Sequence, residues 1–462
     1  MEVKKIINLC DEWASAFGAE VGKNCIQRNN TNEEVFKSGG AFFGFIQPDE
    51  SPSGQYHDFS FVVFPDNKEP KWVVCLGVGS LGFRDDYDLA SVPGLRRKYL
   101  KLMGEDSFIK TDFLDIESNI SRDFIDRVPR LKNSLKKYEK VLPVCEIIQD
   151  VDSPEGQKIL KGFLAQYADI RGWASNRKQR EAIKNALNEA RRKKESIDYQ
   201  KQIMELLLKR KFIILQGAPG TGKTRMAKIL AEGIDGEVYF TQFHAETSYS
   251  DFIWGIRPAL DQKELMYKPS EGVFVKALKK ALANNREGKN TPVILIIDEI
   301  NRANLPSILG PVYYLFEYNM EDSEIEIKIS EDLKLAKLPD NFYVIGTMNT
   351  ADRSIAVVDF ALRRRFAWYT MKPEPVYNDP NFYSDHFNRF SEIFEKYAND
   401  EELNLQPGQG YFFADSKCEM ENRLRYELLP LIKEYFAEGI LLKAKDEFVN
   451  YFYERINEEM FK

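Results

Sequence analysis

Between residues 212 and 371, two kinds of segment alternate along the chain. Short, continuous apolar runs are typical of strands buried on both faces, and the stretches between them carry apolar residues at the three-to-four-residue spacing of helices. The apolar runs are 212–216, 237–241, 293–297, 342–347 and 366–371. Strands that alternate with helices predict a parallel sheet with crossover helices. We therefore expect an α/β domain over residues 206–372.

The chain before this region has a different pattern. Residues 2–17 place apolar side chains at helical spacing, and strand-like runs follow at 41–46, 58–64 and 72–78. The segments between these runs are rich in Pro, Gly, Ser, Asp and Asn, which are the residues of turns. Strands joined by turns predict an antiparallel meander, so we expect residues 1–170 to form a separate α+β domain.

Two helical regions flank the α/β domain. Residues 171–205 are strongly charged and have helical spacing, which predicts a helical connector. Beyond residue 373, helical spacing recurs over 387–397, 419–436 and 443–460, with an interruption at 406–413. We expect residues 373–462 to form an all-α lid on the α/β domain.

The composition is that of an ordinary globular protein. The chain has 462 residues, of which 43% are hydrophobic, and a net charge of −7. An acidic chain is not a general polyanion binder, although a ring of subunits can gather positive charge at its pore. No apolar run of membrane length and no secretory signal appear, so we expect a cytoplasmic protein without membrane contact. Five scattered cysteines and three histidines favour reduced thiols over disulfides, and make a metal site beyond Mg²⁺ improbable.

The first apolar run leads directly into a glycine-rich phosphate-binding sequence. The pattern G-x-x-x-x-G-K-T between a strand and a helix is that of a P-loop. Its expected nucleotide-binding residues are Gly217, Ala218, Pro219, Gly220, Thr221, Gly222, Lys223, Thr224 and Arg225. The glycines let backbone N–H groups point at the phosphates, Lys223 supplies positive charge to the β- and γ-phosphates, and the Thr224 hydroxyl is placed to bind Mg²⁺.

Polar residues follow two further apolar runs. Asp298 and Glu299 end the run at 293–297, where Asp298 can hold Mg²⁺ and Glu299 can orient and activate the attacking water. Asn349 and Asp352 follow the run at 342–347. Because the carboxyl ends of parallel strands form the ligand-binding edge of an open sheet, we expect these side chains near the P-loop. The alternative for Asn349 and Asp352 is that they cap a turn.

Three features of the N-terminal domain allow two interpretations each. The glycine-rich segment 77–86 is a tight turn or a ligand loop, and we favour the turn because no helix follows it. The cluster Arg96, Arg97 and Lys98 is a solvated helix face or a phosphate-contacting patch, and 191–194 has the same two interpretations. Five aromatic residues are core, which we favour, or the walls of a base-binding pocket: Phe42, Phe43, Tyr56, Phe59 and Trp72.

Over roughly residues 200–440 these motifs together resemble the McrB family, the NTPase motors of McrBC modification-dependent restriction systems within the AAA+ superfamily. The resemblance rests on the segments 217–224, 242–244 with 249–252, 297–304, and above all 348–354 followed by 359–366. The segment 407–413 is similar to a Gly-His-Ser-Tyr-Phe element of the family. Gln409 and Gly410 stand here in place of the His and Ser, so no role of that histidine is carried over.

The resemblance implies a hexameric ring that hydrolyses nucleotide, typically GTP, between subunits and drives DNA translocation for a nuclease partner, McrC. It implies that Arg364 is a finger acting on the neighbour's nucleotide, that Arg365 is a sensor acting on the nucleotide of its own subunit, and that Asp359 is an interface residue. Consecutive arginines are costly to bury unpaired beside a sheet, so anionic partners are expected near them, and the alternative to these roles is a salt-bridge network to Asp359 and other acids. The position of residues 1–170 implies a target-recognition domain, although the domain does not clearly match the family's methylcytosine reader. No nuclease constellation is found in the chain, so a separate nuclease is expected.

Two other functions remain open at this stage. One is an ATP-driven AAA+ remodeller of proteins, since the choice of GTP or ATP rests on resemblance alone. The guanine-reading element N-K-x-D of other GTPases is not found in the motor region, because the Asn67-Lys68 pair lies in the N-terminal domain. The other is a nucleic-acid-sensing module whose nucleotide site controls only its assembly.

Overall fold

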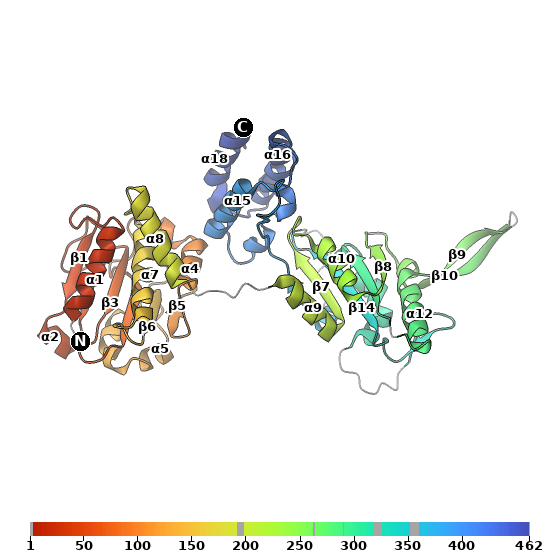
Figure 1. The fold of residues 1–462 in the computed structure, drawn as a ribbon, viewed down its shortest axis with the longest axis horizontal. Helices are drawn as coiled ribbons and strands as arrows, with labels where there is room; N and C mark the ends of the chain where they lie inside the picture. Colours follow the sequence, from red (N-terminus) through yellow and green to blue (C-terminus); the bar gives the residue numbers. More distant parts are fainter. Residues whose placement is uncertain are drawn as a thin grey trace. The chain divides into compact units, whose positions relative to one another are not determined.

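The computed structural model describes residues 3–191, 198–261, 264–289, 291–317, 326–351 and 360–461 (Figure 1). The chain divides into two compact units. The first comprises residues 1–195 and 395–397, and the second comprises residues 196–394 and 398–462. Each unit has its own hydrophobic core.

The first unit is built on a six-stranded antiparallel sheet in the order β1-β2-β3-β4-β6-β5. Three of its strands lie where the apolar runs predict a meander: β2 Phe42–Ile46, β3 Phe59–Phe64 and β4 Trp72–Val78. The other three are β1 Ile26–Asn30, β5 Ser107–Ile109 and β6 Val144–Ile148. The residues of β3 and β4 are all buried, because side chains on both faces of these central strands are covered.

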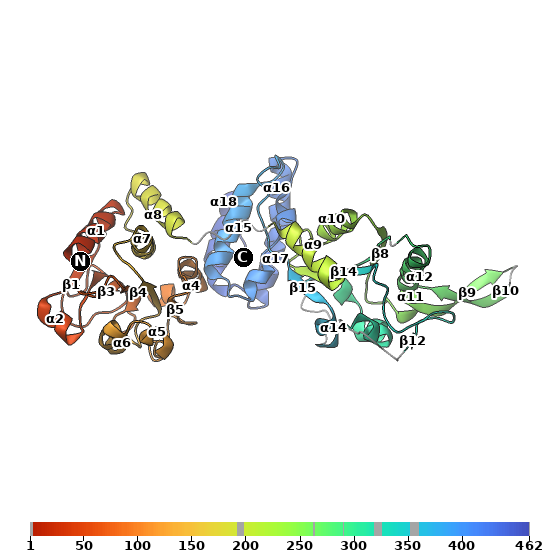
Figure 2. The ribbon, with the colours of Figure 1, turned by 60° about the horizontal axis from the view of Figure 1, so that its bottom comes forward.

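Helices lie on both faces of this sheet (Figure 2). One face packs on α1 Val3–Ala16, α7 Pro154–Ile170 and α8 Arg177–Ala190, and includes Phe61 and Trp72. The other face is covered in part by α5 Arg122–Asp126 and α6 Lys132–Tyr138. Short helices complete the unit: α2 Glu33–Ser38, α3 Tyr87–Ala90 and α4 Pro93–Leu100.

The second unit contains a five-stranded parallel sheet in the order β15-β7-β14-β11-β8. Its strands are β7 Phe212–Gly217, β8 Glu237–Gln242, β11 Val293–Asp298, β14 Phe342–Asn349 and β15 Ala367–Thr370. All five predicted runs are therefore strands of one sheet, and the predicted α/β fold is confirmed. β14 lies between β7 and β11, although it follows both in the sequence.

The sheet of the second unit is covered on both faces, which explains its continuous apolar runs. Alternate residues of β11 enter different cores: Ile294 and Ile296 pack with α9 Tyr199–Arg210 and α10 Lys223–Ile234. Leu295 and Ile297 pack on the other side with α12 Val273–Arg286 and α13 Leu305–Leu309. The expected connector 171–205 is divided, because α8 packs in the first unit and α9 packs in the second.

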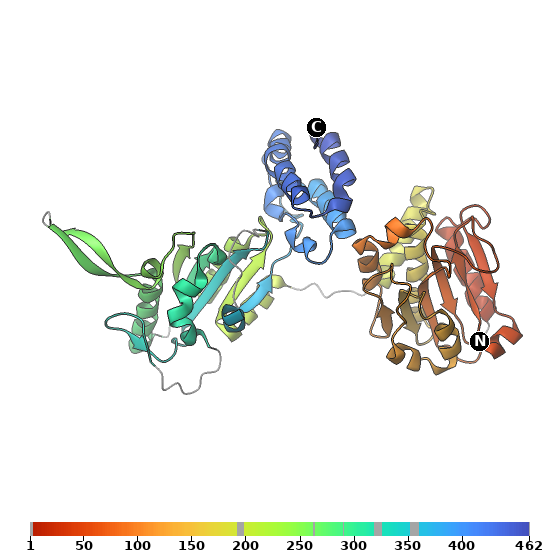
Figure 3. The ribbon, with the colours of Figure 1, turned by 180° about the vertical axis from the view of Figure 1, so that it is seen from behind.

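An antiparallel hairpin extends from the second unit (Figure 3). It consists of β9 Trp254–Asp261 and β10 Glu264–Glu271, which pair with each other as a two-stranded sheet. The helical lid follows β15, and its helices are α15 Ser384–Tyr397, α16 Lys417–Arg423, α17 Leu429–Ala437 and α18 Lys445–Ile456. Aromatic rings dominate the lid core, with Phe390 against Phe412 and Phe448. Among the described residues, no helix combines the length and the apolar character needed to cross a bilayer.

Candidate functional site

The P-loop joins the end of β7 to the start of α10. Gly220 and Gly222 have φ angles of 78° and 82°, a left-handed backbone that favours glycine. The Lys223 side chain is buried, and its Nζ donates hydrogen bonds to the carbonyl oxygens of Gly217 at 3.0 Å and Ala218 at 2.9 Å. Burial lowers the pKa of Lys223 to about 8, and the nearby carboxylates of Glu299 and Asp298 oppose this shift. The predicted phosphate-binding lysine therefore lies inside the loop, whereas Arg225 is exposed on α10.

The carboxylate of Asp298 lies against the P-loop threonine. Its Oδ1 accepts hydrogen bonds from the hydroxyls of Thr224 at 2.7 Å and Thr347 at 2.6 Å. These three side chains come from α10, β11 and β14, which the strand order brings to one edge of the sheet. A hydroxyl oxygen beside a carboxylate is the hard-oxygen donor set that Mg²⁺ prefers. Thr224 and Asp298 therefore fit the predicted role of magnesium ligands.

Glu299 is held by three contacts. Its backbone adopts a left-handed conformation with φ 53°, which is costly for a residue other than glycine, and its N–H donates to Thr347 Oγ1 at 3.1 Å. Its carboxylate accepts hydrogen bonds from Asn349 Nδ2 at 2.5 Å and from Arg302 Nε at 3.1 Å. The side chain that is predicted to activate water is thus fixed in one orientation.

Asn349 lies next to the P-loop. It is the Cα partner of Gly217 in the β14–β7 pairing, and the backbone N–H of the next residue, Thr350, donates to the Gly217 carbonyl at 3.1 Å. The structure therefore brings Asn349 together with Glu299 and the P-loop, as the strand-end argument predicts. Asp352 and Asp359, the other two acidic candidates, lie outside the described residues.

The lid contacts the P-loop through its segment 408–410. The N–H groups of Gly408 and Gly410 donate to the carbonyl oxygens of Pro219 and Gly220, each at 2.9 Å. A Cβ at position 408 would lie 2.2 Å from the carbonyl carbon of Gly220, so only glycine permits this approach. These bonds use carbonyl oxygens of the loop, whereas a P-loop binds phosphate through its backbone N–H groups.

Gln409 makes a second connection from the lid. Its Nε2 donates to the Thr221 carbonyl at 3.1 Å, and its Oε1 accepts from the backbone N–H of Glu374 at 3.3 Å. Glu374 lies between β15 and α15, so one amide joins the P-loop, the lid and the segment that links them. A side chain with both a donor and an acceptor stands where the family resemblance has histidine.

Arg364 and Arg365 converge on Glu317. Both donate to Glu317 Oε1 at 2.5 Å, although the Arg364 side chain is 66% exposed and Arg365 is buried. The Arg365 guanidinium also lies over the ring of Tyr313, at 5.3 Å from its centroid. The anionic partner that the sequence requires for these arginines is thus Glu317, at the end of the 3₁₀ helix Gly310–Phe316.

Sequence reasoning missed four residues of this arrangement: Thr347, Arg302, Glu317 and the bridging role of Gln409. Thr347 carries a usable signal, because a polar residue ends an otherwise apolar strand run at the ligand-binding edge. Arg302, Glu317 and Gln409 carry no such sequence signal, because their partners are distant in the sequence or lie across a turn.

In the first unit, the glycine-rich segment 77–86 is a turn closed around a buried aspartate. The Asp58 carboxylate accepts the backbone N–H groups of Arg84, Asp85 and Asp86. Asp86 in turn pairs with Arg171, with N–O distances of 2.8 and 2.6 Å. The turn that the sequence favours is confirmed, but the reason for favouring it is wrong, because the short helix α3 Tyr87–Ala90 directly follows the segment.

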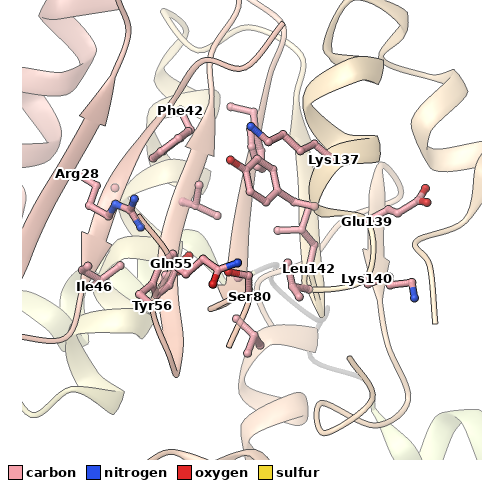
Figure 4. Close-up of a pocket in the computed structure, with 18 of the residues that line it drawn as sticks. Arg28, Phe42, Ile46, Gln55, Tyr56, Ser80, Lys137, Glu139, Lys140 and Leu142 are labelled. Carbon is pink, nitrogen blue, oxygen red and sulfur yellow. Dashed lines mark hydrogen bonds between the residues drawn. The ribbon is translucent and has the colours of Figure 1, made fainter. Parts of the chain in front are cut away.

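The basic helix of the first unit is partly engaged within the unit. Arg96 Nε donates to the Lys110 carbonyl at 3.0 Å, and Lys98 pairs with Asp169 at 2.7 Å. Of the five aromatic candidates, Phe43, Phe59 and Trp72 are core residues. Phe42 and Tyr56, however, line a pocket (Figure 4).

Comparison with known proteins agrees with this geometry. Residues 212–366 match the family model of the AAA domain (dynein-related subfamily). The chain is 38% identical over 234 residues to the type IV methyl-directed restriction enzyme EcoKMcrB subunit of Escherichia coli K12, which covers 49% of this chain and 45% of that protein. It is 28% identical over 273 residues to the type II restriction enzyme BsuMI component YdiS of Bacillus subtilis 168, covering 48% and 78%.

One solved structure, from Cytophaga hutchinsonii, is 18% identical over 52% of this chain and 63% of its own, with a TM-score of 0.27, too low to indicate a shared fold. The chain spans about half the length of its E. coli relative. Residues 212–366 thus form a AAA-type P-loop NTPase domain, and about half of the chain is McrB-like.

Proposed function

We propose that this chain, with its AAA-type domain and McrB-like half, is the nucleotide-driven motor of a restriction system. It hydrolyses GTP within a hexameric ring and drives DNA translocation for a separate nuclease subunit. The names of both relatives support a restriction function, because one is a subunit of a methyl-directed enzyme and the other a component of a restriction enzyme.

The proposed nucleotide hydrolysis is supported above all by two hydrogen-bonded contacts beside Lys223. Asp298 touches Thr224, and Glu299 touches Asn349, at the ends of adjacent strands. Lys223 supplies charge for the β- and γ-phosphates of the nucleotide. Thr224 and Asp298 would hold Mg²⁺, which would supply positive charge to the phosphate oxygens.

Glu299 is placed to act on water. As a carboxylate it accepts a proton while the water oxygen attacks the γ-phosphorus and the bond to the bridging oxygen breaks. The Asn349 amide and the Arg302 guanidinium hold the two carboxylate oxygens, which limits the directions from which water can approach. Asn349 therefore positions Glu299 and faces the phosphate side of the site.

Assembly into a ring is supported by α14 Phe360–Arg365. Arg364 is two-thirds exposed, and Phe360 at the start of the same helix has 89% of its surface exposed. An exposed arginine beside an exposed aromatic ring is suited to contact a neighbouring subunit. In the ring, Arg364 is proposed to leave Glu317 and reach the neighbour's nucleotide, while Arg365 stays on its own subunit. Asp352 and Asp359 keep their proposed roles in catalysis and at the interface.

The experiment compares kcat/KM for GTP and ATP with the purified chain, with and without DNA and the partner nuclease. A candidate partner is any nuclease encoded by the neighbouring reading frame. GTP preference, nucleotide-dependent hexamers by mass photometry, and DNA cleavage that requires both proteins and hydrolysis are expected. ATP preference with unfolding of a protein substrate would instead indicate a remodeller. Tight binding with negligible turnover, even with DNA and partner, would indicate a sensing module.

A further inference from the structure

We propose that Asn301 is a positioning residue for nucleotide hydrolysis. It holds the backbone of Asn349, and through Asn349 it fixes the direction of the Glu299 carboxylate. The inference rests on the function proposed above, because it concerns the step of that reaction in which Glu299 acts on water.

The end of β14 that carries Asn349 extends beyond the pairing of β14 with β11. The register of these two strands ends with Ile297 opposite Gly346, whereas β14 continues along β7 until Asn349 lies opposite Gly217. At Asn349, one side of β14 is therefore supported by the strand of the P-loop, and the other side has no strand partner among the described residues. A buried backbone carbonyl on this open side needs a hydrogen-bond donor from elsewhere.

Asn301 supplies this donor. Its Nδ2 donates to the Asn349 carbonyl oxygen at 3.4 Å. Asn301 is only 4% exposed, so solvent has little access to the bond. The orientation of the amide follows from its partner, because only the NH₂ end of an asparagine side chain can donate to a carbonyl oxygen.

The peptide group that joins Asn349 to Thr350 is held from two opposite sides. Its carbonyl accepts from Asn301, and its N–H donates to the Gly217 carbonyl at 3.1 Å. The C=O and N–H of a trans peptide point in opposite directions, so the two bonds together resist a rotation of the peptide plane. Such a rotation would displace the Cα of Asn349 and with it the side chain that reaches Glu299.

One turn holds both partners of the Asn349–Glu299 contact. The 3₁₀ helix Ile300–Arg302 directly follows Glu299, whose φ of 53° begins the turn. Arg302 donates to the Glu299 carboxylate at 3.1 Å, while Asn301 donates to the Asn349 carbonyl. The carboxylate and the residue that orients it are thus anchored to the same short helix. This common anchor keeps the contact in place where β11 and β14 cease to pair.

A second buried asparagine, just before the opposite end of β14, is the matched control. The Nδ2 of Asn341 donates to the carbonyls of Ala281 at 3.1 Å and Thr291 at 3.0 Å. In Asn341 as in Asn301, Oδ1 has no hydrogen-bond partner among the described residues. The two side chains therefore make the same kind of contact, and they differ in that Asn301 holds a residue of the nucleotide site.

The experiment uses the full chain and whichever of GTP and ATP the wild type hydrolyses. Steady-state hydrolysis gives kcat, and equilibrium binding of a non-hydrolysable analogue gives Kd. We expect Asn301→Ala to lower kcat about three- to tenfold, the effect of one neutral hydrogen bond, and to change Kd by less than about twofold. Asn341→Ala should lower the melting temperature and leave the kcat of the folded protein unchanged.

Asn301→Asp separates the hydrogen bond from the space that the side chain fills. Aspartate has nearly the same shape, but its carboxylate cannot donate and turns an oxygen toward the Asn349 carbonyl. We expect kcat to fall at least as far as in Asn301→Ala, whereas a side chain that only fills space would leave Asn301→Asp closer to the wild type. In an Asn349→Ala chain the positioned amide is absent, so adding Asn301→Ala should slow hydrolysis no further.

The inference is overturned if Asn301→Ala keeps the wild-type kcat, or if Asn301→Asp hydrolyses faster than Asn301→Ala. It is equally overturned if Asn301→Ala slows the Asn349→Ala chain by the same factor as the wild type, or if Asn341→Ala lowers kcat as much as Asn301→Ala. If Asn301→Ala does not fold, Asn301→Asp alone and in the Asn349→Ala chain decides by the same measurements. A wild-type chain that hydrolyses neither nucleotide, even with DNA and partner, would instead contradict the proposed function, and this inference with it.

Discussion

The side-chain amide of Asn349 donates a hydrogen bond to the carboxylate of Glu299, with 2.5 Å between Nδ2 and Oε1. The two residues are distant in the sequence and meet because β14 lies directly beside β11 in the sheet. The contact joins Glu299, the residue proposed to act on water, to a residue that lies opposite Gly217 of the P-loop. We therefore expect hydrolysis to depend on the relative position of three strand ends.

Glu299→Gln should keep nucleotide binding and stop turnover. The substitution preserves the shape of the side chain but removes the group that accepts the proton, and such groups contribute about 10²–10⁴-fold in rate. Equilibrium binding and steady-state hydrolysis measure the two effects separately. Lys223→Ala is the contrasting variant and should lose binding itself. Hydrolysis by Glu299→Gln at the wild-type rate would show that another residue activates the water.

Asn349→Ala should lower kcat more than it changes KM, by about tenfold or more, because it releases the carboxylate from its oriented state. If Asn349 acts through Glu299, the double variant with Glu299→Gln should be no slower than Glu299→Gln alone. A stimulated hydrolysis rate that is unchanged in Asn349→Ala would remove this role and leave Asn349 as a turn residue.

Arg364→Ala should abolish most hydrolysis by the ring, since a finger of this kind contributes about 10³–10⁵-fold. Mixing Arg364→Ala subunits with Lys223→Ala subunits should restore activity, because some interfaces then pair an intact Lys223 with a neighbour's intact Arg364. Arg363→Ala, which removes the adjacent exposed arginine, is the matched control. If mixed rings form and no ratio restores hydrolysis, Arg364 does not act on a neighbour.

Gln409→Glu should separate the two bonds of the lid amide. The new carboxylate can still accept a hydrogen bond from the Glu374 N–H, but it cannot donate to the Thr221 carbonyl. One of its oxygens then lies against the Thr221 carbonyl oxygen, and two acceptors repel each other. We expect a rise of about tenfold in the Kd for nucleotide, and a smaller rise for Gln409→Ala, which leaves no repulsion. Titration calorimetry on both variants checks the order. Equal affinity in the wild-type chain and in Gln409→Glu would show that this bond does not affect the P-loop.

Asp86→Ala should destabilise the first unit by about 3–5 kcal/mol, because it leaves the charge of Arg171 buried without its partner. Both side chains of this pair are only 7% exposed. Thermal unfolding, followed by a probe in the first unit, measures this loss of stability. The double variant Asp86→Leu with Arg171→Met should recover much of the lost stability. Full stability of Asp86→Ala alone would mean that solvent or another group neutralises Arg171.

Several features of this protein were determined by the sequence alone, and each of them is local. The strands of the second unit can be predicted because their residues are buried on both faces of the sheet, so each strand is a continuous apolar run. The P-loop can be predicted because its glycines, two of which adopt positive φ, and its lysine lie close together in the sequence. Asp298 and Glu299 are found because they directly follow a buried strand.

Only the tertiary structure decided the contacts that depend on strand order and on long-range packing. Thr347 reaches Asp298, and Asn349 reaches Glu299, because β14 enters the sheet between two strands that precede it in the sequence. The hairpin β9–β10 was not predicted from the sequence, because each of its two strands contains a proline, Pro258 or Pro269, and proline argues against a strand. Glu317 became the partner of Arg364 and Arg365 through folding alone, because an ion pair across 47 or more residues leaves no local pattern.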